Sequence, residues 1–232
     1  MAWAFLILLH VESSDLRSFK ASLGSEAWIA FCQQVASGAA PHLVLAMWLL
    51  MGAAMMAPTL IPALSTLTDL IDGGHAPERT FAHFSAGYFL VWAGFGVAAT
   101  SVQLGLNALA LLDPLGELSW APATPLLLAL AGLYQFSKWK EACLSRCRQP
   151  LTFFIGHWDE GPMRMGLRMG ALCLGCCWAL MALAFVGGMS SLAVMALAAL
   201  LMTLEKLPQI SRYVTAPLGV GLLGAALFTA FN

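Results

Sequence analysis

Long apolar runs separated by short polar segments dominate the chain. A helix needs about 20 apolar residues to cross a bilayer, and the pattern predicts five such spans together with one shorter helix. The expected spans are residues 41–67, 80–112, 165–189, 190–204 and 215–231, and the shorter helix is 122–137. The pattern therefore predicts an all-α fold, a polytopic transmembrane helical bundle of about six helices that occupies residues 41–232.

Residues 1–40 are expected to form a separate N-terminal segment. The apolar run 2–9 is much shorter than a span requires. We expect it to be a short anchor at the membrane surface, or the end of a span that begins further upstream. Residues 10–40 mix polar and apolar side chains, which is typical of a periplasmic or interfacial segment.

The composition supports a membrane location and argues against two classes of partner. The chain of 232 residues is 60% hydrophobic but only 10% charged, whereas a soluble domain carries about twice that share of charge. We therefore expect membrane lipid around the helices. A formal net charge of −1 argues against nucleic-acid binding, and the sequence has no G-x-x-x-x-G-K-S/T motif of the kind that ATP-driven pumps use, so no nucleotide is expected.

Basic residues predict how the bundle is oriented, because they concentrate on the cytoplasmic side of a membrane. If every span is real, the shorter helix 122–137 included, Arg79, the basic residues from Lys138 to Arg168, and Lys206 all lie on one side. The turns on the opposite side carry none. The loop expected at 138–162 should therefore be cytoplasmic, and the C-terminus periplasmic.

Sulfur-bearing side chains recur on one face of the helix expected at 165–189. Residues four apart share a helix face. The resulting stripe consists of Met165, Met169, Cys173, Cys177 and Met181, with Cys176 beside it. Thiolate and thioether ligands select soft ions, above all Cu(I). Methionine and cysteine are also common packing residues, and Gly166 and Gly170 provide a small-residue packing face, but three cysteines within five residues favour a metal or redox role.

A second sulfur cluster, Met51, Met55 and Met56, lies in the helix expected at 41–67. That helix runs in the opposite direction to 165–189, so the two clusters should reach similar depths near the middle of the bilayer. Within the 138–162 loop, Cys143 and Cys147 are four apart, so one helical turn would present both thiols side by side. The flanking basic residues should favour their thiolate forms; these residues are Lys140, Arg146 and Arg148.

Several motifs together resemble one known family. They are M-W-x-x-M-x-x-x-M-M-x-P at 47–58, G-Y-F-L-V-W-A-G-F at 87–95, Q-x-x-x-x-K-x-A-C-L-x-x-C-R-x-P at 135–150, C-L-G-C-C-W-A-L-M at 173–181 and L-E-K at 204–206. Over about 41–228 the chain resembles the bacterial predicted metal-binding integral membrane proteins called domain of unknown function 2182, which are regarded as copper chaperones. The resemblance implies a multi-pass protein of the bacterial inner membrane. Met169 stands where that family often has His, which favours Cu(I) over Zn²⁺ or Cu(II).

The leading hypothesis is a copper-handling membrane protein without enzymatic activity, a chaperone or conduit that passes Cu(I) to a protein partner. The expected ligands are Cys173, Cys176 or Cys177, and Met51, Met55, Met56 and Met181 would line the approach. Cys143 and Cys147 would exchange the ion on the cytoplasmic side. If only one cysteine binds as thiolate, Cys177 is expected, because it shares a face with Cys173 and Met181.

Two alternatives remain open at this point. The chain could be an accessory structural subunit of a larger membrane complex, its sulfur atoms merely packed. It could also be a thiol–disulfide relay between Cys143/Cys147 and Cys173/Cys177, although the sequence offers no periplasmic cysteine pair as an electron acceptor. Glu205 and Lys206 are interpreted as a helix-end pair, with Lys206 extending to the membrane interface.

Overall fold

The computed structural model of the protein describes residues 35, 38, 40–113, 116–187, 192–207 and 210–231. Within these ranges the chain forms eight α-helices and two short 3₁₀ helices, and no strand beyond one isolated bridge between Leu112 and Leu118. This confirms the all-α fold. The anchor expected at 2–9, and nearly all of the N-terminal segment 1–40, lie outside the described residues.

The helices follow one another as α4 (Pro41–Asp72), α5 (Arg79–Ala108), α6 (Ala123–Gln135), α7 (Lys138–Cys147), α8 (Pro150–His157), α9 (Pro162–Ala182), α10 (Leu192–Lys206) and α11 (Ser211–Phe231), with η1 (Trp158–Glu160) and η2 (Leu183–Phe185) on either side of α9. Four of the described helices are long and apolar enough to cross a membrane: α4, α5, α9 continued through η2, and α11. The described part of α10 has 15 residues, fewer than a span requires. The described structure therefore offers four candidate spans where the sequence pattern predicted five.

The segment expected to be the loop 138–162 is largely helical. Its first helix, α7, is capped by Ser137, whose side chain accepts a hydrogen bond from the backbone N–H of Lys140 at 3.1 Å. Pro150 begins α8, in a position where its missing N–H costs nothing. Buried Phe154 then packs on Phe84 of α5, with ring centroids 5.3 Å apart. The loop is thus part of the core, which the sequence interpretation missed.

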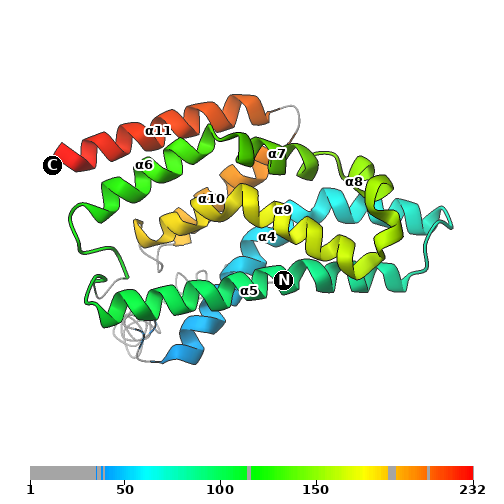
Figure 1. Ribbon diagram of the computed structural model, residues 1–232, viewed down its shortest axis with the longest axis horizontal. Coiled ribbons are helices and arrows are strands. Elements are labelled where there is room, and N and C mark those ends of the chain that lie inside the picture. The colour runs from blue at the N-terminus through cyan, green and yellow to red at the C-terminus, as the bar shows by residue number, and fades with distance from the viewer. Residues whose placement is uncertain are drawn as a thin grey trace, which may run out of the picture.

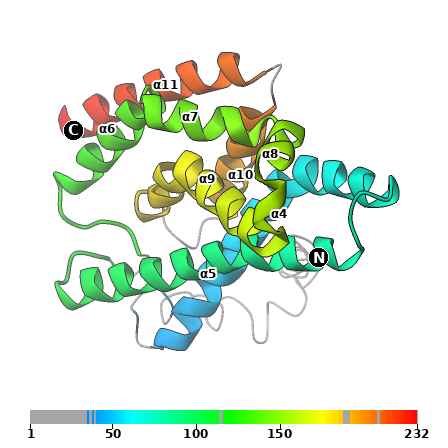
Figure 2. The same cartoon turned by 45° about the vertical axis from the view of Figure 1, so that its right-hand side comes forward.

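Helix α9 lies at the centre of the bundle. It packs along α5 and also contacts α6, α7 and α10. In Figures 1 and 2, α6 and α11 lie side by side on one side of the molecule and α5 lies on the other, with α9 and α10 between them. Other helices therefore also cover part of α9 away from α5, although Trp178, which contacts Tyr134 of α6, remains 42% exposed.

Glycines allow α5 and α9 to touch through their backbones. A Cβ atom on Gly166 would collide with the carbonyl oxygen of Phe84, and one on Gly170 would lie 3.0 Å from the carbonyl oxygen of Tyr88. The small-residue packing face expected at Gly166 and Gly170 is therefore confirmed. One turn further along α9, this contact brings Cys173 next to the side chain of Tyr88.

Candidate metal centre

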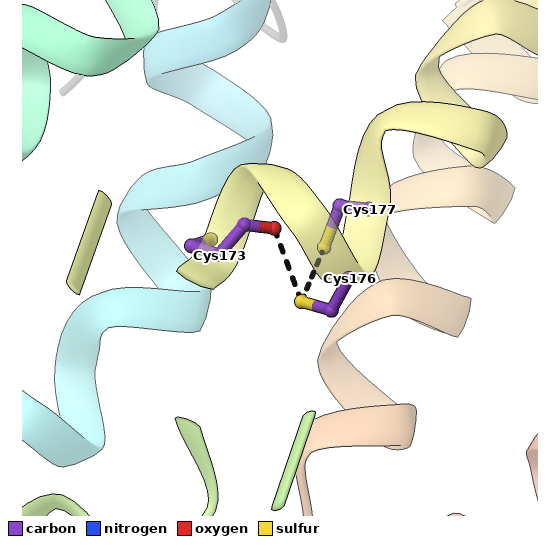
Figure 3. A group of neighbouring side chains, drawn as sticks. All are labelled: Cys173, Cys176 and Cys177. Carbon is purple, nitrogen blue, oxygen red and sulfur yellow. Dashed lines mark hydrogen bonds between the residues drawn. The ribbon is translucent and has the colours of Figure 1, made fainter. Parts of the chain in front are cut away.

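Three cysteines of α9 form a compact, buried cluster, which we call the cysteine cluster: Cys173, Cys176 and Cys177. Their sulfur atoms all lie within 4.8 Å of one another, and each residue is about 1% exposed. The Cys176 thiol donates to the backbone oxygen of Cys173 at 3.1 Å, and its sulfur lies 3.3 Å from that of Cys177 (Figure 3). This separation is too long for a disulfide, so all three sulfurs are available to a soft metal ion.

Cys173 has a polar environment inside the bundle. The Nζ atom of Lys206 donates to its sulfur at 2.9 Å, and the hydroxyl of Tyr88 lies 3.0 Å from the same atom. A buried ammonium is costly unless it is paired with an anion, so the contact with Lys206 favours the thiolate form of Cys173. The hydrogen bond of this cation goes to Cys173, whereas Cys177 was the residue expected to be the thiolate.

The interpretation of Glu205 and Lys206 as a helix-end pair was wrong. Lys206 is only 8% exposed and reaches Cys173 instead of the membrane interface. Glu205 is also buried, and its carboxylate accepts hydrogen bonds from Nζ of Lys140 at 2.7 and 2.9 Å. The two residues are consecutive in α10, yet one binds α9 and the other binds α7.

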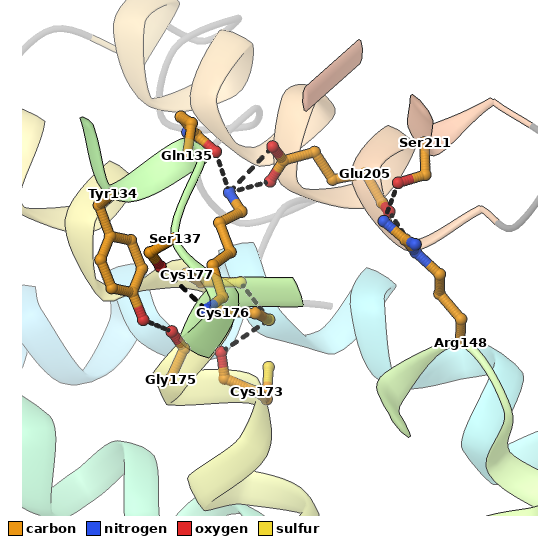
Figure 4. Close-up of polar contacts among 11 residues, drawn as sticks. Tyr134, Gln135, Ser137, Arg148, Cys173, Gly175, Cys176, Cys177, Glu205 and Ser211 are labelled. Atoms are coloured by element: carbon orange, nitrogen blue, oxygen red, sulfur yellow. Dashed lines mark hydrogen bonds and ion pairs between the residues drawn. The ribbon is translucent and has the colours of Figure 1, made fainter. Parts of the chain in front are cut away.

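The contact with Glu205 belongs to a network that fixes α7 to its neighbours (Figure 4). Lys140 also donates to the side-chain oxygen of Gln135 at the end of α6. Arg148, just after α7, donates to the backbone oxygen of Glu205 at 3.1 Å and to the hydroxyl of Ser211 at the start of α11. The position of α7 is therefore set by charged contacts with three other helices.

Helix α7 carries the outer pair of thiols, Cys143 and Cys147, onto the surface of α9. The sulfur of Cys143 lies 2.8 Å from where a Cβ of Gly175 would be, so only glycine leaves room for this contact. Cys147 packs against the core that contains the cysteine cluster and lies close to Cys176. Both outer cysteines are half-buried, so the outer pair adjoins the cysteine cluster at Cys176.

The basic neighbours of Cys143 do not have the effect expected from the sequence. Burial raises the pKa of the Cys143 thiol, and the opposing effect of Arg146 is smaller. Lys140 is paired with Glu205, and Arg148 is engaged with Glu205 and Ser211. Cys143 is therefore a neutral thiol near pH 7, and the expected thiolate form is incorrect for this residue.

The methionines expected at the site fall into two groups. Met56 joins the cysteine cluster, since its sulfur lies 3.8 Å from that of Cys173. Met51, Met55 and Met181 instead line a small cavity near η2, one helical turn beyond Cys177, together with Met195 of α10. All residues named as candidate ligands thus lie in one connected region, but they do not form a single shell.

The sequence interpretation did not identify Tyr88 or Met195 as part of this region. It named Lys206 but did not expect its contact with Cys173. The sequence did offer a reason to single out Lys206. An ionisable residue in an apolar helix is a functional candidate if other helices surround it. Tyr88 and Met195 are ordinary residues of apolar helices and carry no such signal. Their roles follow only from the packing of α5 and α10 against α9.

Comparison with protein families matched the chain to a family model described as PpoB2: Copper chaperone, over residues 45–229. The matched region contains every candidate ligand from Met51 to Met195. Comparison with curated proteins and with solved structures gave no match.

Proposed function

Because the chain belongs to the PpoB2 copper chaperone family, we propose that it is an integral membrane protein that binds Cu(I) at the cysteine cluster and passes the ion to a protein partner. The observation that carries this proposal is the buried group of three cysteine sulfurs within 4.8 Å of one another. Soft sulfur ligands select Cu(I) over the harder divalent ions. The protein has no catalytic role in this proposal; it holds and transfers an ion.

Charge balance suggests how many thiolates bind the ion. In a low-dielectric interior the charges of a site must nearly cancel. Cu(I) alone would be neutralised by one thiolate, but the ammonium of Lys206, 2.9 Å from Cys173, adds a second positive charge. Two thiolates then give a neutral site. We assign them to Cys173 and to Cys177, which lies one turn further on the same face, with Met56 as a neutral ligand.

The outer pair supplies a route for transfer. Cys147 lies next to Cys176, so an ion bound at Cys147 can form a bond to Cys176 before its first bond breaks. In this ligand exchange the copper remains Cu(I), the incoming thiol releases its proton and the leaving thiolate takes one up. No oxidant or reductant is required.

The family resemblance implies a bacterial inner-membrane location, and the basic residues of α7 and of the start of α9 favour an orientation with 138–162 in the cytoplasm. The outer pair would then receive or deliver copper on the cytoplasmic side. A membrane-impermeant maleimide should fail to label Cys143 in intact cells and should label it after lysis. Labelling in intact cells would reverse the proposed orientation.

The binding experiment uses the full chain purified in detergent under reducing conditions, with Cu(I) measured by competition against a Cu(I) chelator. We expect Cys173→Ser and Cys177→Ser each to abolish most tight binding. Met56→Leu should only weaken it, because a thioether carries no charge. Cys147→Ser is the matched control: it should leave equilibrium binding intact while it slows transfer to an acceptor. If Cys173→Ser and Cys177→Ser both bind copper like the parent, the cluster is a packing element, as a structural subunit would require.

A thiol–disulfide relay is the second candidate, and the closeness of Cys147 to Cys176 favours it. The relay would require these thiols to cycle through a disulfide, whereas copper ligands stay reduced in the cytosol. Acid trapping of thiols from growing cells separates the two candidates. A substantial disulfide involving Cys143 or Cys147 would support the relay, and fully reduced thiols would support copper transfer.

A further inference from the structure

Four methionines line a small cavity near η2, and we propose that this cavity is a second Cu(I) site made of thioether ligands alone. Met51 and Met55 come from α4, Met181 from α9 and Met195 from α10. The inference depends on the proposed function for the choice of ion, but the site itself contains none of the cysteines. We call it the methionine cavity.

The size of the methionine cavity suits a single ion. Its volume is about 20 Å³, enough for one water-sized sphere and far below the several hundred Å³ of a site for an organic ligand. A water molecule there would need two to four polar partners. The described residues that complete the lining are all apolar: Leu180, Leu183, Ala184, Val194 and Ala198. A soft cation can bind thioether sulfur, whereas water has little to bind.

Methionine is also a common gap-filler in cores, so burial alone does not identify a ligand. Met202 illustrates ordinary packing: it is fully buried in the same helix as Met195 but does not line the cavity. The methionine cavity differs because four methionines from three separate helices line one void. Three of them, Met51, Met55 and Met181, are at most 4% exposed.

The methionine cavity should bind Cu(I) much more weakly than the cysteine cluster. None of the described lining residues is charged, so the ion would keep its full positive charge in an apolar environment. At the cysteine cluster, thiolates neutralise it. An uncompensated buried charge costs several kcal/mol, which corresponds to a dissociation constant larger by about a thousandfold or more.

A weak site next to a strong one suits release. The stripe on α9 connects the outer pair, which adjoins Cys176, to Met181 at the η2 end of the helix. An ion that enters at Cys147 could therefore pass along the stripe on α9 and leave through the methionine cavity, at the η2 end of the helix. This makes the protein a conduit with separate entry and exit ligands.

The test is a Cu(I) titration of the full chain in detergent under reducing conditions, with a series of chelators of graded affinity. The parent should bind one equivalent tightly and one about a thousandfold more weakly. Met181→Leu/Met195→Leu, a nearly volume-conserving change, should lose the weak equivalent and keep the tight one. Met195→Leu alone should weaken it measurably. Met202→Leu is the matched control and should retain both equivalents.

The outcomes separate this inference from the proposed function. A parent that binds a single tight equivalent, or a Met181→Leu/Met195→Leu variant that keeps the weak equivalent, would overturn the methionine site while leaving the cysteine cluster intact. If the cluster did not bind copper, the parent would show only the weak equivalent, and the methionine variant would bind none. X-ray absorption at the copper edge provides an independent readout, because the second equivalent should add thioether sulfur and no nitrogen.

Discussion

Replacing Glu205 with Gln should destabilise the protein strongly, because it removes one partner of a buried ion pair. The side chains of Lys140 and Glu205 are 1% and 2% exposed, and their charged atoms lie 2.7 Å apart. Loss of one partner from such a pair costs about 3–5 kcal/mol. Lys140 keeps its hydrogen bond to Gln135, so we expect the lower end, about 3 kcal/mol. Since 1 kcal/mol lowers Tm by about 2–4 °C in a chain of this size, Tm should fall by about 6–12 °C.

The double variant Lys140→Met/Glu205→Leu tests the electrostatic explanation. Replacing both partners with apolar side chains of similar volume removes the unpaired charge, so its stability should return to within about 1 kcal/mol of the parent or exceed it. Glu141→Gln is the control, because Glu141 pairs with Arg148 at 3.3 Å on the surface and should change stability by less than about 1 kcal/mol. The assay is thermal loss of helical circular dichroism in one detergent. A double variant no more stable than Glu205→Gln, or a control equally destabilised, would refute the reasoning.

Three further outcomes follow from the same structure. Gly166→Ala should lower the stability of the protein by about 1–3 kcal/mol, because the added methyl group clashes with the backbone of α5. Gly224→Ala, whose added methyl group meets no atom within 4 Å, should be neutral or slightly stabilising. Equal changes in Tm for the two variants would contradict this. Lys206→Met should weaken Cu(I) binding by about a hundredfold or more in chelator competition, because a thiolate loses its buried counter-charge, while Lys206→Arg should retain part of the affinity. Burial raises the pKa of Cys143. The rate of its reaction with maleimide in detergent should therefore still increase about tenfold per pH unit at pH values where the rate for an ordinary cysteine has levelled off. A rate that levels off as early as that of an ordinary cysteine would count against the raised pKa.

The sequence was sufficient to predict the long helices, the family and the cysteine cluster, because each depends on local pattern, whereas α7 and α8 were expected to be loop. The apolar runs placed α4, α5, α9 and α11 near their observed bounds, and the family match confirms the resemblance to copper chaperones. Gln103, a buried amide of α5, accepts a hydrogen bond from the indole N–H of Trp48 at 2.8 Å. Amides enclosed by apolar helices need such partners.

Contacts between distant parts of the chain could not be predicted in the same way. Lys206 meets a cysteine 33 positions earlier, and Lys140 meets Glu205 65 positions later; only the packed helices bring them together. The methionines divided for a geometric reason. Consecutive residues point about 100° apart on a helix, so Met56 faces Cys173 while Met55, its neighbour, faces the methionine cavity.

The backbone contact between α5 and α9 also restricts how the family can vary in length. Gly166 and Gly170 hold α9 against α5, and Cys173 follows three residues later. Each residue turns a helix by about 100° and advances it by about 1.5 Å. One inserted residue between Gly170 and Cys173 would therefore rotate the whole cysteine cluster away from Lys206, with every ligand still present. A change of about four residues leaves the angle about 40° away and one of about seven nearly restores it, but these would displace the cluster by about 6 and 10 Å along the helix. Homologues should therefore conserve this spacing as strictly as the cysteines themselves.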